Sequence, residues 1–160
     1  MEQTLEEVRS SPLPFANYPK DEAKLRKSIW IGSNCRHEYG LKFIQVTRQN
    51  CCAYCRTPIA TDYNAWLTMV IDHAVPVSVC KNLKIPPEFC RSLANMVLAC
   101  AACNGFDNRY KPSFEPRDAT FQEFLAFRDR VFIERLERIR ERRKKEREDF
   151  FEKKVKLLFG

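Results

Sequence analysis

Two pairs of closely spaced cysteines constrain this 160-residue chain more than any other feature. Each pair has C-x-x-C spacing, which lets two thiolates turn toward one metal ion at about 2.3 Å from each sulfur. The pairs are Cys52 with Cys55 and Cys100 with Cys103. Together they offer four tetrahedral ligands, so the sequence predicts a structural zinc ion. Four thiolates leave no open coordination position, so any chemistry is expected elsewhere.

The remaining cysteines have no partner at ligand spacing. Cys51 is an alternative to Cys52 with poorer spacing, and Cys35, Cys80 and Cys90 are predicted to be buried or half-buried thiols. The N-terminus is acidic and lacks the apolar stretch of a secretory signal, and no run of about 18 apolar residues predicts a membrane span. We therefore expect a cytoplasmic protein without membrane contact, in which cysteines bind metal or stay reduced.

The sequence pattern divides the chain into four segments and predicts an α+β fold. Residues 1–20 have three prolines and little periodicity, which indicates an extended arm. The other segments are a helical lead-in, a zinc domain and one long charged helix, over residues 21–50, 51–117 and 118–160. Within the zinc domain, the apolar run 66–71 predicts a strand. A short strand or turn is expected over 75–79, and a helix from Pro86 to about Val97.

Two polar residues, Asp72 and His73, follow the predicted strand. The only other histidine, His37, lies among polar residues and is predicted to be on the surface. One interpretation of His73 is a histidine that hydrogen-bonds a turn. A functional role is favoured by Asn104, which directly follows the last cysteine, where zinc would hold it. Carboxylate and amide oxygens suit magnesium or manganese, and a neutral imidazole beside such an ion can take a proton from water. These three residues would suffice for metal-assisted phosphodiester hydrolysis.

The order of these motifs resembles that of HNH endonucleases with a ββα-metal fold. The matching segments are Cys52-Ala-Tyr-Cys55, Asp72-His73-Ala-Val-Pro76, Asn95 before an apolar stretch, and Cys100-Ala-Ala-Cys103-Asn104, within about residues 45–112. The resemblance implies a β-hairpin and a helix clamped by zinc. It also implies that His73 is the general base and that Asp72 and Asn104 bind a catalytic Mg²⁺ or another divalent ion. By the same resemblance, Asn95 braces the loop that carries the base.

Two departures from the family pattern concern substrate handling. The family often has a Gly-Gly turn soon after Asp-His-x-x-Pro, whereas residues 77–94 contain no glycine here. The family often has a lysine three residues after the final asparagine, where this chain has Asp107. Asp107 is either a further metal neighbour or an obstacle to phosphate binding. Arg109 and Lys111 are then the candidates for holding the phosphate.

The net charge of +7 makes nucleic acid the first candidate partner. The helix 118–160 has three open interpretations: a DNA contact through Arg142 and Arg143, a solvated helix with internal ion pairs, or a partner helix with a terminal apolar stripe that supports an oligomer. We expect an HNH endonuclease that cuts DNA. The alternative is a zinc-knuckle module that binds nucleic acid or protein without cutting, and a more distant one is an interaction domain of a larger assembly.

Overall fold

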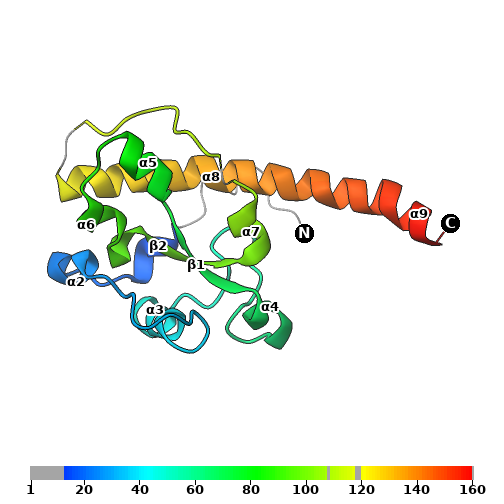
Figure 1. Ribbon diagram of the computed structural model, residues 1–160, viewed down its shortest axis with the longest axis horizontal. Helices are drawn as coiled ribbons and strands as arrows, with labels where there is room; N and C mark the ends of the chain where they lie inside the picture. The colour runs from blue at the N-terminus through cyan, green and yellow to red at the C-terminus, as the bar shows by residue number, and fades with distance from the viewer. Residues whose placement is uncertain (1–12, 108, 118–119, 160) are drawn as a thin grey trace.

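The computed structural model describes residues 13–107, 109–117 and 120–159, and it combines helices with one small antiparallel sheet. Strand β1 (Met69–His73) pairs with β2 (Met96–Cys100), with Met69 opposite Cys100 and His73 opposite Met96. The long helix α8 (Phe121–Asp149) crosses one side of the sheet, and α3 (Tyr39–Thr47) lies on the other side (Figure 1). The predicted α+β class and the long C-terminal helix are confirmed.

Shorter elements surround this three-layer arrangement. In chain order they are η1 (Pro14–Asn17), α2 (Glu22–Arg26), α4 (Tyr63–Leu67), α5 (Val77–Asn82), α6 (Pro87–Cys90), η2 (Leu93–Asn95), α7 (Ala101–Gly105), the π-helical turn η3 (Phe150–Lys154) and α9 (Val155–Phe159). Because α5, α6 and η2 lie between the two strands, β1 and β2 do not form a tight hairpin. No helix in the described part of the chain is both long and apolar enough to cross a membrane.

Burial explains why β2 is uniformly apolar. All five residues of β2 are buried, because the strand has α8 on one face and the α3 side of the molecule on the other. In β1 the exposure varies along the strand, and only Met69 and Ile71 are buried. The core around the sheet includes Phe43, Tyr54 and Phe132, whose side chains are completely enclosed.

The structure corrects three local predictions in the zinc domain. Trp66 and Leu67 end helix α4, which Asp62 caps by accepting a 2.7 Å hydrogen bond from the Ala65 amide, so the strand begins only at Met69. Residues 77–82 form helix α5, where a short strand or turn was expected over 75–79. The helix predicted from Pro86 to Val97 stops at Cys90, because residues 96 and 97 pair with β1.

The described part of the predicted N-terminal arm packs onto the core. The Phe15 ring lies 5.6 Å from that of Phe132, and the Tyr18 hydroxyl donates a 2.5 Å hydrogen bond to the Met96 carbonyl. Residues 13–20 are therefore part of the folded unit rather than an extended arm. Residues 1–12 of the predicted arm lie outside the described residues.

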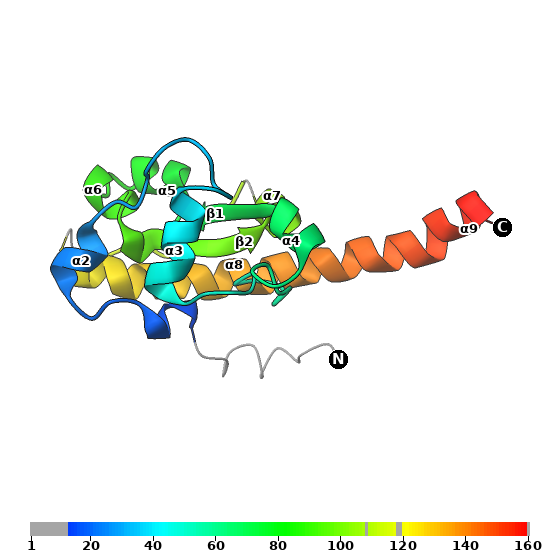
Figure 2. The same ribbon diagram turned by 90° about the horizontal axis from the view of Figure 1, so that it is seen from below.

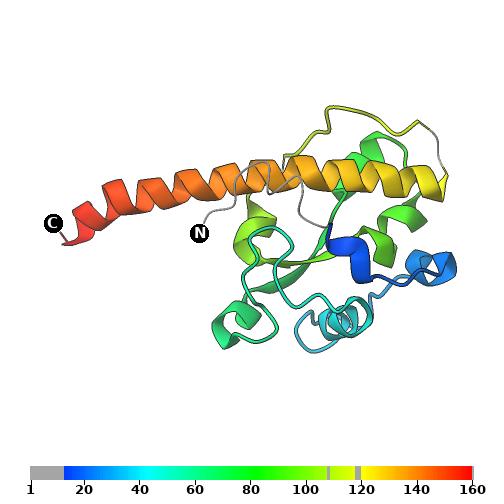
Figure 3. The same ribbon diagram turned by 180° about the vertical axis from the view of Figure 1, so that it is seen from behind.

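Helix α8 has two different halves. The first half packs on the core, and the rest projects beyond the body of the molecule (Figures 2 and 3). Ion pairs of i,i+4 spacing line the projecting half, among them Arg142–Glu146 at 2.9 Å and Glu141–Lys145 at 3.8 Å. The apolar side chains near the end of the chain, including Phe151 and Phe159, are exposed. The ion pairs favour the solvated-helix interpretation for this segment.

Candidate metal centre and adjoining acid–base residues

The four paired cysteines converge into one cluster. Cys52 and Cys55 lie in a turn, Cys100 ends β2, and Cys103 lies in α7. Their sulfur atoms all lie within 4.8 Å of one another, and Cys55 and Cys100 are 3.9 Å apart. A tetrahedral ion about 2.3 Å from each sulfur requires sulfur separations of roughly 3.8 Å. The cluster can therefore hold a metal ion such as zinc.

Hydrogen bonds within the cluster move the pKa values of its four thiols in opposite directions. The Cys103 thiol lowers the pKa of Cys100 to about 6. Hydrogen bonds from the other three thiols lower the pKa of Cys55 far below its usual range, and the bond from Cys100 has the largest effect. The Cys100 amide also donates to Cys52 Sγ at 3.4 Å. Hydrogen bonding with Cys100 is the main cause that raises the pKa of Cys52 and of Cys103 above the usual range. Two of the four thiols therefore favour the thiolate form that metal binding requires, and two favour the thiol.

The other four cysteines stay outside the cluster as free thiols. As predicted, Cys80 and Cys90 are buried and Cys35 is half-buried, and Cys51 is half-buried as well. Cys51 takes part in an isolated backbone bridge with Pro58, so its neighbour Cys52 is the one that faces the cluster. Cys52, rather than Cys51, completes the first C-x-x-C pair.

Asp72 forms a buried ion pair at the end of β1. Its Oδ2 accepts hydrogen bonds from Tyr54 Oη at 2.6 Å and from Arg135 Nη2 at 3.0 Å. The pKa of Tyr54 is raised well above its usual range, mainly by burial and also by the charge of Asp72. The phenol therefore remains protonated and acts as a hydrogen-bond donor. Asp72 Oδ1 has no hydrogen bond to any described residue. One carboxylate oxygen is thus occupied by protein and the other is not.

Arg135 of α8 organises the end of β1 and was not singled out from the sequence. Its side chain is only 3% exposed, and its Nη1 donates to the carbonyls of His73 at 2.6 Å and Ala74 at 2.9 Å. A sequence signal did exist, because position 135 lies four residues from the apolar Val131 and Ile139. An arginine on the apolar face of a helix is expected to need a buried partner.

His73 is half-buried, and its ring contacts a different side of the molecule from Asp72. The ring stacks on Trp30 at 5.8 Å, whereas the Asp72 carboxylate faces α8. Successive strand residues point to opposite faces, which explains the difference. Burial lowers the pKa of His73, Arg135 and Arg91 lower it further, and Asp72 opposes them. The imidazole is therefore neutral at pH 7, and neither ring nitrogen hydrogen-bonds a described residue.

Asn95 fastens the turn that follows His73. Its side chain is fully buried, and its Oδ1 accepts a 2.8 Å bond from the Val75 amide. Its Nδ2 donates to the carbonyls of Val75 at 3.0 Å and Cys90 at 2.9 Å. The Asn95 carbonyl also accepts from the Ala74 amide at 2.7 Å. Asn95 thus joins the turn after β1 to the segment before β2.

Asn95→Ala is expected to lower the free energy of unfolding by about 2 to 4 kcal/mol, because it leaves buried backbone groups of Val75 and Cys90 without partners. Asn82→Ala is the matched control, since Asn82 is exposed, and a change within about 0.5 kcal/mol is expected there. Urea unfolding measures both values. Equal stabilities for the two variants would contradict this role of Asn95.

Asn104 and Asp107 have different surroundings. Asn104 is half-buried on α7, which packs against both strands, and its side chain forms no hydrogen bond within the described residues. Asp107 is 6% exposed, and its Oδ1 accepts a 3.1 Å bond from Arg138 Nε. Asp107 ties the segment after α7 to α8, so it is neither an open metal neighbour nor an exposed repulsion to phosphate. Arg109 and Lys111 are exposed.

The two arginines proposed as DNA contacts differ from each other. The Arg142 side chain is 58% exposed and pairs with Glu146. Arg143 instead directs Nη1 to Cys103 Sγ at 3.6 Å, so its charge lies beside the cysteine cluster. Arg142 is thus the one that faces solvent, although Glu146 already pairs with its guanidinium.

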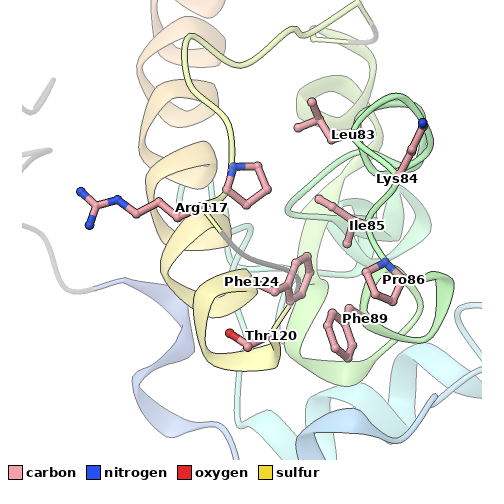
Figure 4. Close-up of a pocket in the computed structure, with 9 residues that line it drawn as sticks. Leu83, Lys84, Ile85, Pro86, Phe89, Arg117, Thr120 and Phe124 are labelled. Atoms are coloured by element: carbon pink, nitrogen blue, oxygen red, sulfur yellow. The ribbon is translucent and has the colours of Figure 1, made fainter.

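A separate groove of about 330 Å³ lies between the α5–α6 connection and the start of α8 (Figure 4). Its floor is apolar and includes Ile85, Phe89 and Phe124, with Lys84 and Arg117 also lining it. None of its described lining residues is a cysteine, a histidine or an acid. The groove therefore contributes no candidate catalytic group.

Comparisons of the chain with protein-family models, with curated proteins and with solved structures found no match. Any assignment of function therefore depends on the residues themselves: the cysteine cluster, the end of β1 and the surfaces around them.

Proposed function

We propose that the protein is an HNH-type, metal-dependent endonuclease that hydrolyses phosphodiester bonds of DNA. One observation carries the proposal. Helix α7, which begins after Cys100 and bears Cys103 and Asn104, packs against β1, which ends in Asp72 and His73. Zinc bound by the four thiols would be structural and would fix α7 to the Cys52–Cys55 turn. The reduced thiols agree with a cytoplasmic location.

The proposed catalytic ion would bind to oxygen atoms that the protein leaves free. Asp72 Oδ1 and the Asn104 amide oxygen are such atoms within the described residues, and Mg²⁺ typically combines one or two protein oxygens with several waters. When bound, the ion would stabilise the phosphate and the departing oxygen. Arg135 shares the Asp72 carboxylate and adds positive charge, so we expect weak Mg²⁺ binding that needs other ligands from the substrate.

His73 would accept the proton of the attacking water. Its imidazole is neutral and its nitrogens are not engaged by described residues, so the group is available as a base. The backbone around it is held on both sides, by Arg135 at the His73 carbonyl and by Asn95 at the Ala74 amide. This support limits the movement of the base relative to the strand.

His73→Ala is expected to reduce nicking of supercoiled plasmid by about 100-fold or more in magnesium or manganese, because it removes the general base. The zinc content and the Tm should stay at the wild-type values. The control is Gln122→Ala, which changes an exposed residue at the start of α8 and should leave nicking unchanged. A wild-type protein that does not nick with magnesium, manganese or nickel would refute the proposal.

The second candidate is a zinc-knuckle module that binds nucleic acid, or a protein partner, without cutting. It is favoured by the Asp72–Arg135 ion pair and by the different directions of Asp72 and His73. The exposed Arg109, Lys111 and Arg142 would serve such a module equally well. It predicts DNA binding without cleavage in any divalent metal. A helix-mediated oligomer through the exposed end of the chain is compatible with both candidates.

A further inference from the structure

We propose that an aromatic stripe beside His73 binds the unpaired bases of single-stranded DNA. This inference rests on the proposed function and deepens it, because it names the form of the substrate. The stripe lies on the side of the molecule that carries α3 and α4, away from α8 (Figure 1). Its members are the rings of Trp30, His37, Tyr39, Tyr63 and Trp66.

One end of the stripe adjoins the candidate base. The Trp30 ring lies 4.5 Å from the Tyr39 ring and 5.8 Å from the His73 ring, with a 26° angle to the imidazole. Trp30 is nevertheless 38% exposed. A large ring held by two neighbours and open to solvent is a preformed surface for another flat group. It lies directly beside the ring of the proposed base, His73.

The other end of the stripe is built in the same way. Tyr63 stacks on Trp66 at 6.3 Å and is 70% exposed, while His37 contacts the edge of Trp66 at 5.5 Å. The Arg36 guanidinium lies 5.5 Å from the centre of the Trp66 ring and donates a 2.8 Å bond to the Leu67 carbonyl. This end therefore offers both a ring surface and a fixed positive charge.

One segment of the chain connects the two ends of the stripe. Residues 30–39 contribute Trp30 and Tyr39 to the His73 end and His37 to the Trp66 end. Strand β1 runs alongside, from Met69 near α4 to His73, a distance of about 13 Å at roughly 3.3 Å per residue. A strand of nucleic acid that follows the stripe would pass several rings before it reaches the base.

Arg36 supplies a positive charge on the stripe, and the two acids beside it are engaged by backbone amides. Glu38 is exposed, but its Oε2 accepts the amides of Ser33 at 2.8 Å and Asn34 at 2.6 Å. Asp62 is used as the cap of α4. Aromatic faces combined with cations bind any base by stacking, but a duplex keeps the faces of its bases inside the helix. The stripe should therefore select single strands over duplexes.

The chain offers a direct probe, because its only two tryptophans, Trp30 and Trp66, both lie in the stripe. A (dT)10 oligonucleotide, added without divalent ions, is expected to quench tryptophan emission and to bind at least roughly tenfold more tightly than a ten-base-pair duplex. An abasic decamer with the same phosphates should cause little quenching. This comparison separates stacking from attraction by charge alone.

Substitutions test which rings are responsible. Trp30→Ala and Trp66→Ala are each expected to weaken (dT)10 binding by roughly tenfold, whereas Trp30→Phe should retain most of the affinity. Phe159→Ala is the matched control, because Phe159 is 83% exposed but lies at the end of the projecting helix. The affinity of each variant for (dT)10 is measured by the fluorescence anisotropy of a labelled oligonucleotide. Circular dichroism checks that each variant is folded.

Two results would overturn the inference. One is that the duplex or the abasic decamer binds as tightly as (dT)10, and the other is that folded Trp30→Ala binds like the wild type. The measurement involves no cleavage, so loss of nicking in the His73→Ala experiment would not affect it. Conversely, a protein that nicks DNA but shows no preference for single strands would disprove only this inference.

Discussion

Cys52→Ser is expected to unfold the domain at room temperature, whereas Cys51→Ser, one residue earlier, should leave it folded. Cys52 is one of the four clustered thiols, and Cys51 is not. Zinc held by four thiolates contributes folding free energy on the order of 10 kcal/mol or more, which exceeds or equals the stability of most small domains. Circular dichroism and the bound-zinc content per chain measure the outcome.

Removal of the metal from the wild-type protein provides an independent check on this prediction. A strong chelator should produce the same loss of structure as Cys52→Ser, and added zinc should reverse it, because the cluster is the only group of clustered metal-ligating residues found in the described part of the chain. A metal-free Cys52→Ser protein with the wild-type Tm would show that the cluster does not support the fold.

Arg135→Met should produce the second-largest effect, a loss of about 3 to 5 kcal/mol of unfolding free energy. The arginine is the buried counter-charge of Asp72, and its Nε also lies 3.9 Å from Asp107 Oδ2. Removing it leaves the Asp72 carboxylate with only the Tyr54 hydroxyl as a partner, whereas Asp107 keeps its ion pair with Arg138. The substitution also removes the hydrogen bonds that Arg135 donates to the carbonyls of His73 and Ala74, which join the end of β1 to α8. Urea unfolding measures the change.

A double-mutant cycle separates the ion pair from the packing of the arginine. Arg135→Met combined with Asp72→Asn should recover part of the loss, because the uncompensated charge is then absent. Arg142→Met on the exposed part of the same helix should change stability by less than about 1 kcal/mol. A loss below 1 kcal/mol for Arg135→Met would mean that this buried pair does not hold β1 to α8.

The cysteine cluster could be predicted from the sequence because metal ligation imposes a local rule. Two thiols must be two residues apart to reach the same ion, and the pattern is visible without knowledge of the fold. The i,i+4 ion pairs Glu141–Lys145 and Asp149–Lys153 were predictable for the same reason, since helix geometry alone brings them together. The long C-terminal helix follows from the same short-range periodicity.

Strand boundaries and the fate of the charged residues depend on distant partners instead. Met96 and Val97 have helical spacing with Phe89 and Leu93, but pairing with β1 takes them into a strand. The contact of Arg143 with Cys103 could not be predicted from the sequence, because the two residues are 40 positions apart.

By itself, the sequence determined that four thiols would meet, that a long charged helix would end the chain, and that an acid and a histidine would follow an apolar run. The tertiary structure decided how those groups are used. It turned Asp72 toward Arg135 and His73 toward Trp30, and it enclosed Asp107. Local patterns are set by backbone geometry, whereas the partners of a buried charge depend on which helix covers it.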